Sequence, residues 1–246
     1  MDKYLKNPFI LLLLCGFLLN ACTEKIETIN IAVASNFEST LNQIVGLYQN
    51  KNNSSITINI IAASSGVLAT QIINKAPYDL FLSADTIKPN LVKQKLNSQN
   101  PVESYAVGQL ALWIPDSKRK THCIDELTKV KSLSMANPKT APYGKAALDI
   151  IQNKNIQVEK IINTSSVSQA YLYTQEKLTQ AGFVAYPMLD YHSKGCIQRF
   201  TDSQLTQSMI LLNEKANDFY NFILSEDIQN LIQESGYIKA DKLLAD

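Results

Sequence analysis

The pattern of apolar and polar positions along the chain predicts strands and helices in alternation. Residues 29–34 form a short apolar run of strand length, and apolar side chains then recur every third or fourth position over residues 37–48, as on one face of a helix. Similar patterns predict further strands at 57–62, 78–83, 108–114, 132–136, 161–162, 182–185 and 208–212, and helices at 67–73, 88–96, 123–130, 146–152, 167–178, 213–225 and 226–235. This order is typical of α/β proteins whose mostly parallel sheets are covered by helices.

The length of 246 residues allows one large domain or two lobes. A single wound sheet is one arrangement. We favour two α/β lobes joined by crossing strands, the first built from residues 29–105 and 200–246 and the second from residues 106–199. The chain would then leave the first lobe near Tyr105 and return to it near Phe200.

The N-terminal segment differs from the rest of the chain. Lys3 and Lys6 precede an apolar stretch at 8–19, which is the layout of a secretory signal and is shorter than the roughly 20 apolar residues of a membrane-spanning helix. The stretch ends in Leu-Asn-Ala before Cys22, which resembles a bacterial lipobox. We therefore expect a lipoprotein signal peptide at 1–21, lipidation of Cys22 after cleavage, and a tether at 22–28. The protein would sit on the periplasmic face of the membrane; ordinary cleavage, which would leave it soluble in the periplasm, is the alternative.

Composition and charge exclude several classes of function. Hydrophobic residues make up 46% of the chain and charged residues 18%, as in an ordinary globular protein. The net charge is +1, and loss of the signal peptide would leave as many basic as acidic residues, so bulk charge attracts no nucleic acid. His122 and His192 lack metal-ligand spacing and are interpreted as surface residues, and the sequence contains no P-loop. We expect no cofactor, no metal site and no nucleic-acid partner.

Two further cysteines would reach the mature protein. Cys123 and Cys196 would enter an oxidising compartment, where disulfides are common. Their spacing does not reveal whether they pair, so a disulfide and two separate thiols both stay open.

Four expected strand–helix junctions share one chemistry. Each carries Ser, Thr or Asn near a helix start, or Pro in its first turn, at residues 35–38, 63–66, 136–144 and 163–167. Ser35 and Glu38 have the spacing of a capping box, and a hydroxyl of the Ser64-Ser65 pair is expected to cap the next helix. For any one junction, capping alone is the ordinary explanation.

Several such helix starts facing one cleft would bind an anion. Each start exposes N–H groups without partners in the helix, and the helix dipole places about half a positive charge there. In open α/β sheets these junctions lie at the carboxyl ends of strands, where ligands bind. Amides and hydroxyls that donate would hold a dianion and reject a ligand that brings its own proton to the same position.

The junctions belong to sequence blocks with a recognisable order. The chain carries AVASNF at 32–37, ASSGVLATQI at 63–72, APYDLFLSAD at 76–85, ANP at 136–138, APYGKAA at 141–147 and GFVA at 182–185. In this order and spacing the blocks resemble the periplasmic molybdate-binding proteins of bacterial ABC transporters, from about residue 29 to the C-terminus. The second and third blocks are the most specific.

The resemblance implies a type II periplasmic-binding fold whose two lobes close over one tetrahedral oxyanion, molybdate or the similar tungstate. Carried over by position, Ser35 and Ser65 would donate hydroxyl and backbone hydrogen bonds from the first lobe, and Asn36 would join them. Tyr143 and Val167 would donate backbone N–H groups from the second lobe. In one branch of the family a tyrosine follows the Gly-aliphatic-Val strand directly; in this chain it comes one place later, at Tyr186, which we leave out of the expected contacts.

The resemblance also implies a monomeric solute-binding protein, not an enzyme, that hands its ligand to the permease of an ABC importer. Two alternatives stay open. A receptor for another oxyanion such as sulfate would differ mainly in the size of its cavity, and an enzyme on the same fold would need a nucleophile–base pair that the sequence does not suggest. Asp79 and Asp85 flank an expected strand and are interpreted as turn and cap residues rather than as an acid–base pair.

Overall fold

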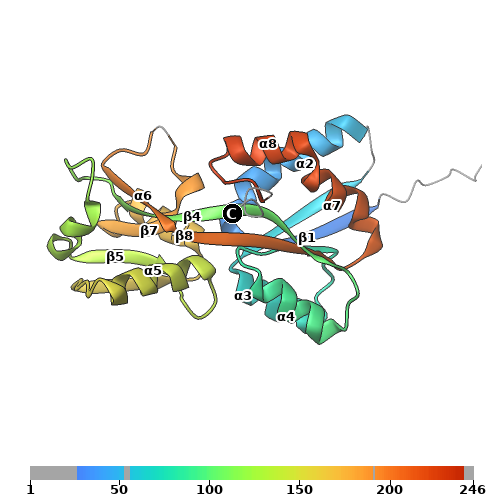
Figure 1. Ribbon diagram of the computed structural model, residues 1–246, viewed down its shortest axis with the longest axis horizontal. Helices are drawn as coiled ribbons and strands as arrows, with labels where there is room; N and C mark the ends of the chain where they lie inside the picture. The colour runs from blue at the N-terminus through green and yellow to red at the C-terminus, as the bar shows by residue number, and fades with distance from the viewer. Residues whose placement is uncertain (1–26, 53–55, 191, 241–246) are drawn as a thin grey trace, which may run out of the picture.

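The computed structural model describes residues 27–52, 56–190 and 192–240. The predicted signal peptide, Cys22 and most of the predicted tether lie outside these residues. Thr28, the last residue of the predicted tether, already belongs to the first strand. Figure 1 shows two lobes side by side, with two long strands running through both.

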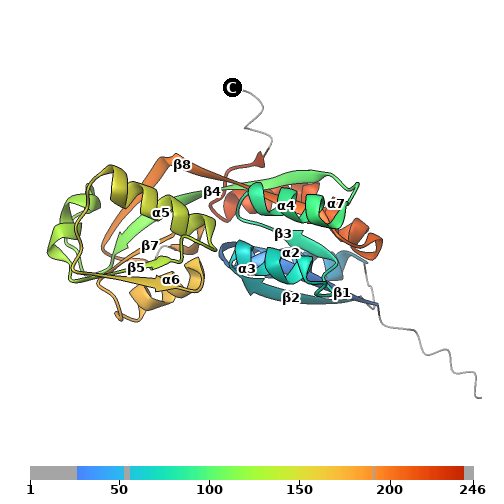
Figure 2. The same cartoon turned by 90° about the horizontal axis from the view of Figure 1, so that it is seen from below.

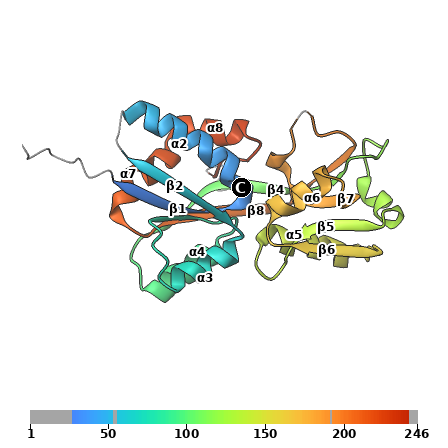
Figure 3. The same cartoon turned by 180° about the vertical axis from the view of Figure 1, so that it is seen from behind.

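The first lobe has a sheet between two layers of helices. Strands β1 (Thr28–Ala34), β2 (Thr57–Ala63) and β3 (Leu80–Leu82) run parallel. One face of this sheet is covered by α3 (Ser65–Ile73) and α4 (Ile87–Leu96) (Figure 1). The other face is covered by α2 (Glu38–Asn52), α7 (Asn217–Leu224) and α8 (Glu226–Glu234) (Figure 3). Successive side chains of a strand point to opposite faces, so a strand covered on both faces is mostly apolar. Accordingly, Ile31 packs in the core on the α2 side while its neighbour Ala32 packs in the core on the α3 side.

The second lobe has the same layered arrangement with fewer elements. Strand β5 (Ser132–Ala136) pairs in parallel with β6 (Lys160–Thr164) and β7 (Ala181–Ala185), and α5 (Pro142–Asn153) and α6 (Val167–Gln175) lie on opposite faces (Figure 1). Short 3-10 helices complete both lobes: η1 (Ser35–Phe37), which leads into α2, η2 (Cys123–Lys129), η3 (Tyr186–Met188) and η4 (Glu214–Ala216).

Two long antiparallel strands connect the lobes (Figure 2). Strands β4 (Val102–Ile114) and β8 (Cys196–Leu211) pair with each other over most of their length, so both lobes share one eight-stranded sheet of order β2-β1-β3-β8-β4-β7-β5-β6. Along β4 the core changes from that of the first lobe to that of the second between Ala106 and Leu110, and along β8 it changes back between Leu205 and Met209. The two proposed architectures, one sheet and two lobes, are thus combined.

Some elements differ from the sequence-based expectation. The predicted strand at 208–212 is only the end of β8, which begins at Cys196. The first part of β8 was not predicted because much of it is exposed and polar and therefore gives no apolar signal. The predicted helix at 123–130 is the 3-10 helix η2, and the predicted helix at 167–178 ends at Gln175. Within α6 the helix stops shortly before Lys177, whose φ of 57° is incompatible with a continuing right-handed helix.

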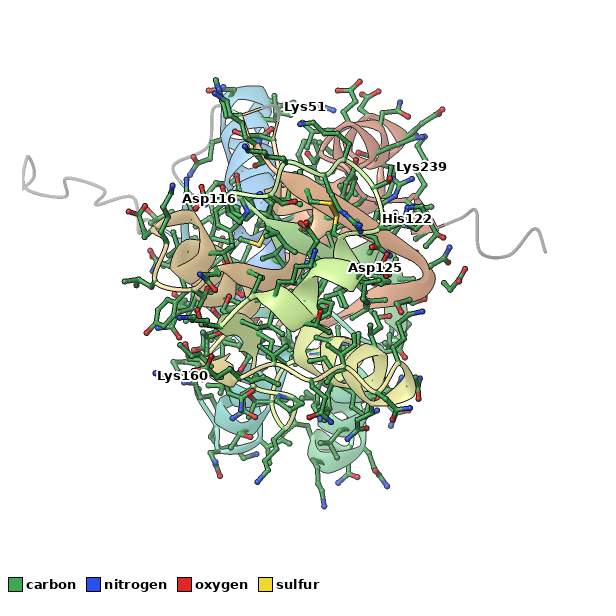
Figure 4. All side chains as sticks on the ribbon, turned by 90° about the vertical axis from the view of Figure 1, so that its left-hand side faces the viewer. Lys51, Asp116, His122, Asp125, Lys160 and Lys239 are labelled. Atoms are coloured by element: carbon green, nitrogen blue, oxygen red, sulfur yellow. A yellow bond between two sulfur atoms is a disulfide. The ribbon has the colours of Figure 1, made fainter. Side chains whose placement is uncertain are left out.

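The question left open for the cysteines has an answer in the structure. A disulfide joins Cys123 at the start of η2 to Cys196 at the start of β8. It lies at the outer end of the second lobe, and Figure 4 looks onto this end, where His122 and Asp125 project from the surface. No helix among the described residues is long and apolar enough to cross a membrane.

Candidate functional site

The five residues expected at the ligand line one small cavity at the boundary between the lobes. The inner ends of α3 and α5 approach each other there (Figure 2). The cavity is small, with a volume of about 10 Å³ for the centre of a water molecule, and it is partly open to solvent. Its lining is formed by Ala34, Ser35, Asn36, Ala63, Ser64, Ser65, Ala84, Ala141, Pro142, Tyr143 and Val167. Among these described residues there is no Asp, Glu, Lys, Arg or His, so any attraction for an anion comes from uncharged donors.

Ser65 is held with its proton free to donate. Its side chain is only 1% exposed, and its Oγ accepts a hydrogen bond from the backbone N–H of Ala84 at 3.0 Å. A hydroxyl has one donor and two acceptor positions, so accepting from Ala84 leaves the O–H bond available. Ala84 follows β3 and Ser65 begins α3, so two junctions of the first lobe meet at this hydroxyl.

Ser35 and Gly66 lie where the lobes touch. The carbonyl oxygen of Ser35 accepts from the Oγ of Ser168 in α6 at 2.9 Å, and the N–H of Gly66 donates to the carbonyl of Thr140 at 2.8 Å. A Cβ on Gly66 would lie 2.8 Å from the Thr140 oxygen, so the close approach of the lobes requires glycine there. The structure therefore represents a closed arrangement of the lobes.

From the second lobe, the first turns of two helices contribute to the cavity lining. Val167 is the first residue of α6 and Tyr143 the second of α5, so their N–H groups belong to first helical turns that lack helical partners. The side chains of both residues pack in the second-lobe core. Pro142 at the first position of α5 lacks an N–H, as expected for a first turn.

A buried network of hydrogen bonds holds two of the cavity residues, Asn36 and Tyr143, in place. The side-chain amide of Gln207 in β8 donates to the Tyr143 hydroxyl at 3.2 Å and accepts from the Asn36 amide at 3.0 Å and the Tyr105 hydroxyl at 3.0 Å. The Asn36 amide also donates to Tyr237 at 3.2 Å. Both donor hydrogens of Asn36 thus have protein partners, which leaves its main-chain N–H as the donor it can offer to a ligand.

The phenols of this network stay neutral. Burial raises the pKa of Tyr105 and of Tyr143 well above the usual value, with a smaller contribution in the same direction from the nearby Tyr237. Burial likewise raises the pKa of Tyr237. The cavity therefore keeps one charge state over the whole neutral range.

Two of the predicted helix caps are wrong. Ala34, not Ser35, occupies the cap position of η1, and no side chain caps it, because Ser35 already lies in the first turn. The cap position of α3 is Ser64, and its hydroxyl makes no capping hydrogen bond. By contrast, Ser166 caps α6 by accepting from the Gln169 N–H. In the first lobe the hydroxyls at the helix starts are therefore not used by the helices.

The other polar candidates have structural partners away from the cavity. Asp79 accepts from the Asn30 N–H at 2.7 Å and forms a salt bridge with Lys215 at 3.0 Å, and Asp85 accepts from the Lys88 N–H at 2.8 Å. Tyr186 does not line the cavity; the Arg199 guanidinium lies over its ring at 4.8 Å. Among the described residues no group of three or more His, Cys, Asp and Glu could hold a metal ion.

A larger and more open cavity adjoins the first on the side of α2 and α6. Besides Ser35, Asn36 and Ser168, its lining includes Glu38 and Asp190. Two carboxylates make this space unfavourable for an anion, so the smaller cavity is the better candidate.

Comparison with known proteins agrees with this geometry. The model of a family described as bacterial extracellular solute-binding protein matches residues 29–238. The molybdate-binding protein ModA of Azotobacter vinelandii is 30% identical over 175 residues, which cover 67% of this chain and 67% of that protein. The chain belongs to this molybdate-binding family of bacterial solute-binding proteins. A second family member, ModA of Rhodobacter capsulatus, is 29% identical over 224 residues, covering 84% of this chain and 86% of that protein.

The molybdate-binding family also supplies the fold. The solved structure of the periplasmic molybdate-binding protein of Azotobacter vinelandii superposes with a TM-score of 0.71 and 24% identity, covering 85% of this chain and 98% of that one. This match confirms the predicted α/β periplasmic-binding fold. At 24% identity the match supports the fold alone, and the nature of the ligand depends on the residues of the cavity.

The sequence did not predict Ala84 of the cavity lining or Gln207 of the buried polar network beside it. Ala84 lies at the end of the APYDLFLSAD block, so its place in a matched block was a signal that could have added it to the site. Gln207 offers no such signal, because a glutamine in a half-exposed strand looks like a surface residue. Only the fold brings it next to Asn36, which is 171 positions away in the chain.

Proposed function

We propose that this solute-binding protein captures molybdate, or the similar tungstate, in the interlobe cavity and delivers it to the permease of an ABC importer. The ligand would be held by uncharged donors: the hydroxyl and N–H groups of Ser35 and Ser65, and the main-chain N–H groups of Asn36, Tyr143 and Val167. The protein binds and releases its ligand without changing it, and it acts as a monomer.

The observation that carries this proposal is the convergence of helix starts on a cavity whose described lining contains no Asp, Glu, Lys, Arg or His. Residues of η1, α3, α5 and α6 line it together. Hydrogen bonds to a charged acceptor contribute about 1.5–3 kcal/mol each, and several of them from the cavity wall suffice for a Kd below about 1 μM. The same lining lacks the nucleophile–base pair that the enzyme alternative requires.

Delivery to an importer favours a two-state binding protein. Contacts across the lobes, such as Ser168 Oγ to Ser35 O, would break when the lobes open about β4 and β8 and release the ligand.

A lipid on Cys22 would keep the protein at the membrane, close to the permease. Membrane fractionation of the Cys22→Ala variant is expected to find it released into the soluble fraction, whereas retention in the membrane would contradict the anchor.

Titration calorimetry with molybdate, tungstate, sulfate and phosphate tests the ligand. We expect a Kd below about 1 μM for the first two anions and much weaker binding of the others. Equal affinity for sulfate would favour the alternative of a general oxyanion receptor, and no binding of any of the four would overturn the proposal.

A further inference from the structure

The hydroxyl of Ser64 is buried in the candidate site without a protein partner. Ser64 is 5% exposed and lines the cavity between Ala63 and Ser65. Within the described part of the chain, its Oγ makes no hydrogen bond, although its carbonyl accepts from the Leu68 N–H at 3.1 Å as the first bond of α3. An unpaired buried hydroxyl destabilises the folded protein, so native structures rarely keep one without a reason.

A backbone N–H that could donate to the Ser64 hydroxyl at the cap position of α3 is bonded to another residue. A serine at a cap position normally accepts from an N–H two or three residues later. Here the N–H of Gly66, two residues on, donates to Thr140 of the second lobe at 2.8 Å. The close contact between the lobes therefore takes away one capping donor, and no cap bond forms.

Two other hydroxyls show what distinguishes Ser64. Tyr220 is the other buried hydroxyl without a partner among the described residues, but it packs in the first-lobe core and does not line the cavity. Ser65 lines the cavity, but its Oγ already accepts from Ala84. Ser64 alone of these three combines burial, a free donor and a free acceptor with a place in the cavity wall.

We propose that the Ser64 hydroxyl donates a hydrogen bond to the bound oxyanion and is thus a further ligand contact beside Ser35 and Ser65. This inference rests on the proposed function. Because the Ser64 hydroxyl makes no hydrogen bond that caps α3, it would stabilise the protein only through its hydrogen bond to the anion.

The experiment compares Ser64→Ala with wild type in two measurements, the Kd for molybdate by calorimetry and the thermal midpoint of the ligand-free protein. Loss of one donor to a charged acceptor is expected to weaken molybdate binding about tenfold. The midpoint of the ligand-free variant is expected to stay equal or to rise, since a buried hydroxyl without a partner is removed.

Ser225→Ala is the matched control. Ser225 also precedes a helix, α8, but its Oγ donates to the Phe222 carbonyl at 2.7 Å and lies away from the cavity lining. Its substitution is expected to lower the thermal midpoint and to leave the Kd unchanged, the reverse of the Ser64→Ala result.

An unchanged Kd in Ser64→Ala, beside normal molybdate binding by the wild type, would overturn this inference alone. A lower midpoint with an unchanged Kd would further assign Ser64 to the stability of α3. If the wild type itself did not bind molybdate, the proposed function would fail and this inference with it.

Discussion

The two lobes offer the candidate site different kinds of donor. The first lobe presents serine hydroxyls that its helices leave unused, at Ser35, Ser64 and Ser65. In the second lobe the side chains of Tyr143 and Val167 pack in the core, so these helix starts can offer a ligand their main-chain N–H groups. Ligand affinity should therefore depend on side-chain identity in the first lobe, and in the second lobe on where the helices begin.

Ser65→Ala is expected to give the largest effect. It removes a donor to the anion and leaves the buried Ala84 N–H without its acceptor. Together these losses should weaken molybdate binding by about 1–3 kcal/mol, or up to about 100-fold in Kd by calorimetry. A Kd within about twofold of wild type would show that the first lobe does not rely on side chains.

Gly66→Ala tests whether the lobes must close as they do here. The added Cβ would lie 2.8 Å from the Thr140 carbonyl oxygen, and relief of such crowding costs about 1–3 kcal/mol. We expect about tenfold weaker molybdate binding. Because alanine favours the helix, the ligand-free variant should not lose thermal stability if its lobes are open. Unchanged affinity would mean that the Gly66–Thr140 contact is not needed for binding.

Val167→Ala addresses the second lobe. The valine side chain is 3% exposed within the core, so its truncation should lower the free energy of unfolding by about 1–3 kcal/mol. Since the main-chain N–H remains, the Kd for molybdate should change by less than about threefold. Chemical denaturation and calorimetry on one preparation check both parts, and a large loss of affinity without loss of stability would contradict the division between the lobes.

The comparison also shows what the sequence could predict. The short buried strands, such as 182–185, were predicted because both their faces are covered and their residues carry no polar side chain. Four of the expected cavity residues lie in matched blocks and Val167 was carried over by its position relative to the family, and the structure brings all five together. Whether each contacts the ligand stays a prediction.

What the sequence left out depends on contacts between distant segments. The first part of β8 is exposed and polar on much of its surface, so only its pairing with β4 reveals it as a strand. The capping box at Ser35 had the right residue spacing, but the 3-10 turn of η1 begins one residue early and places Ser35 inside it. Local motifs specify residue types well and their exact place in a turn poorly.

The smallest expected effect is that of pH, and it tests the feature that both lobes share. No Asp, Glu, Lys, Arg or His lines the cavity among the described residues, and burial raises the pKa of Tyr143 and Tyr105 well above the usual value. A raised phenol pKa means that the neutral form persists to higher pH, so no negative charge develops beside the anion as pH increases. The Kd for molybdate should therefore vary by less than about twofold between about pH 6 and pH 9, where free tyrosine is still protonated. Calorimetric titrations across this range at constant salt measure it. A steep fall in affinity with rising pH would mean that a cationic side chain, and not the uncharged donors of the two lobes, holds the ligand.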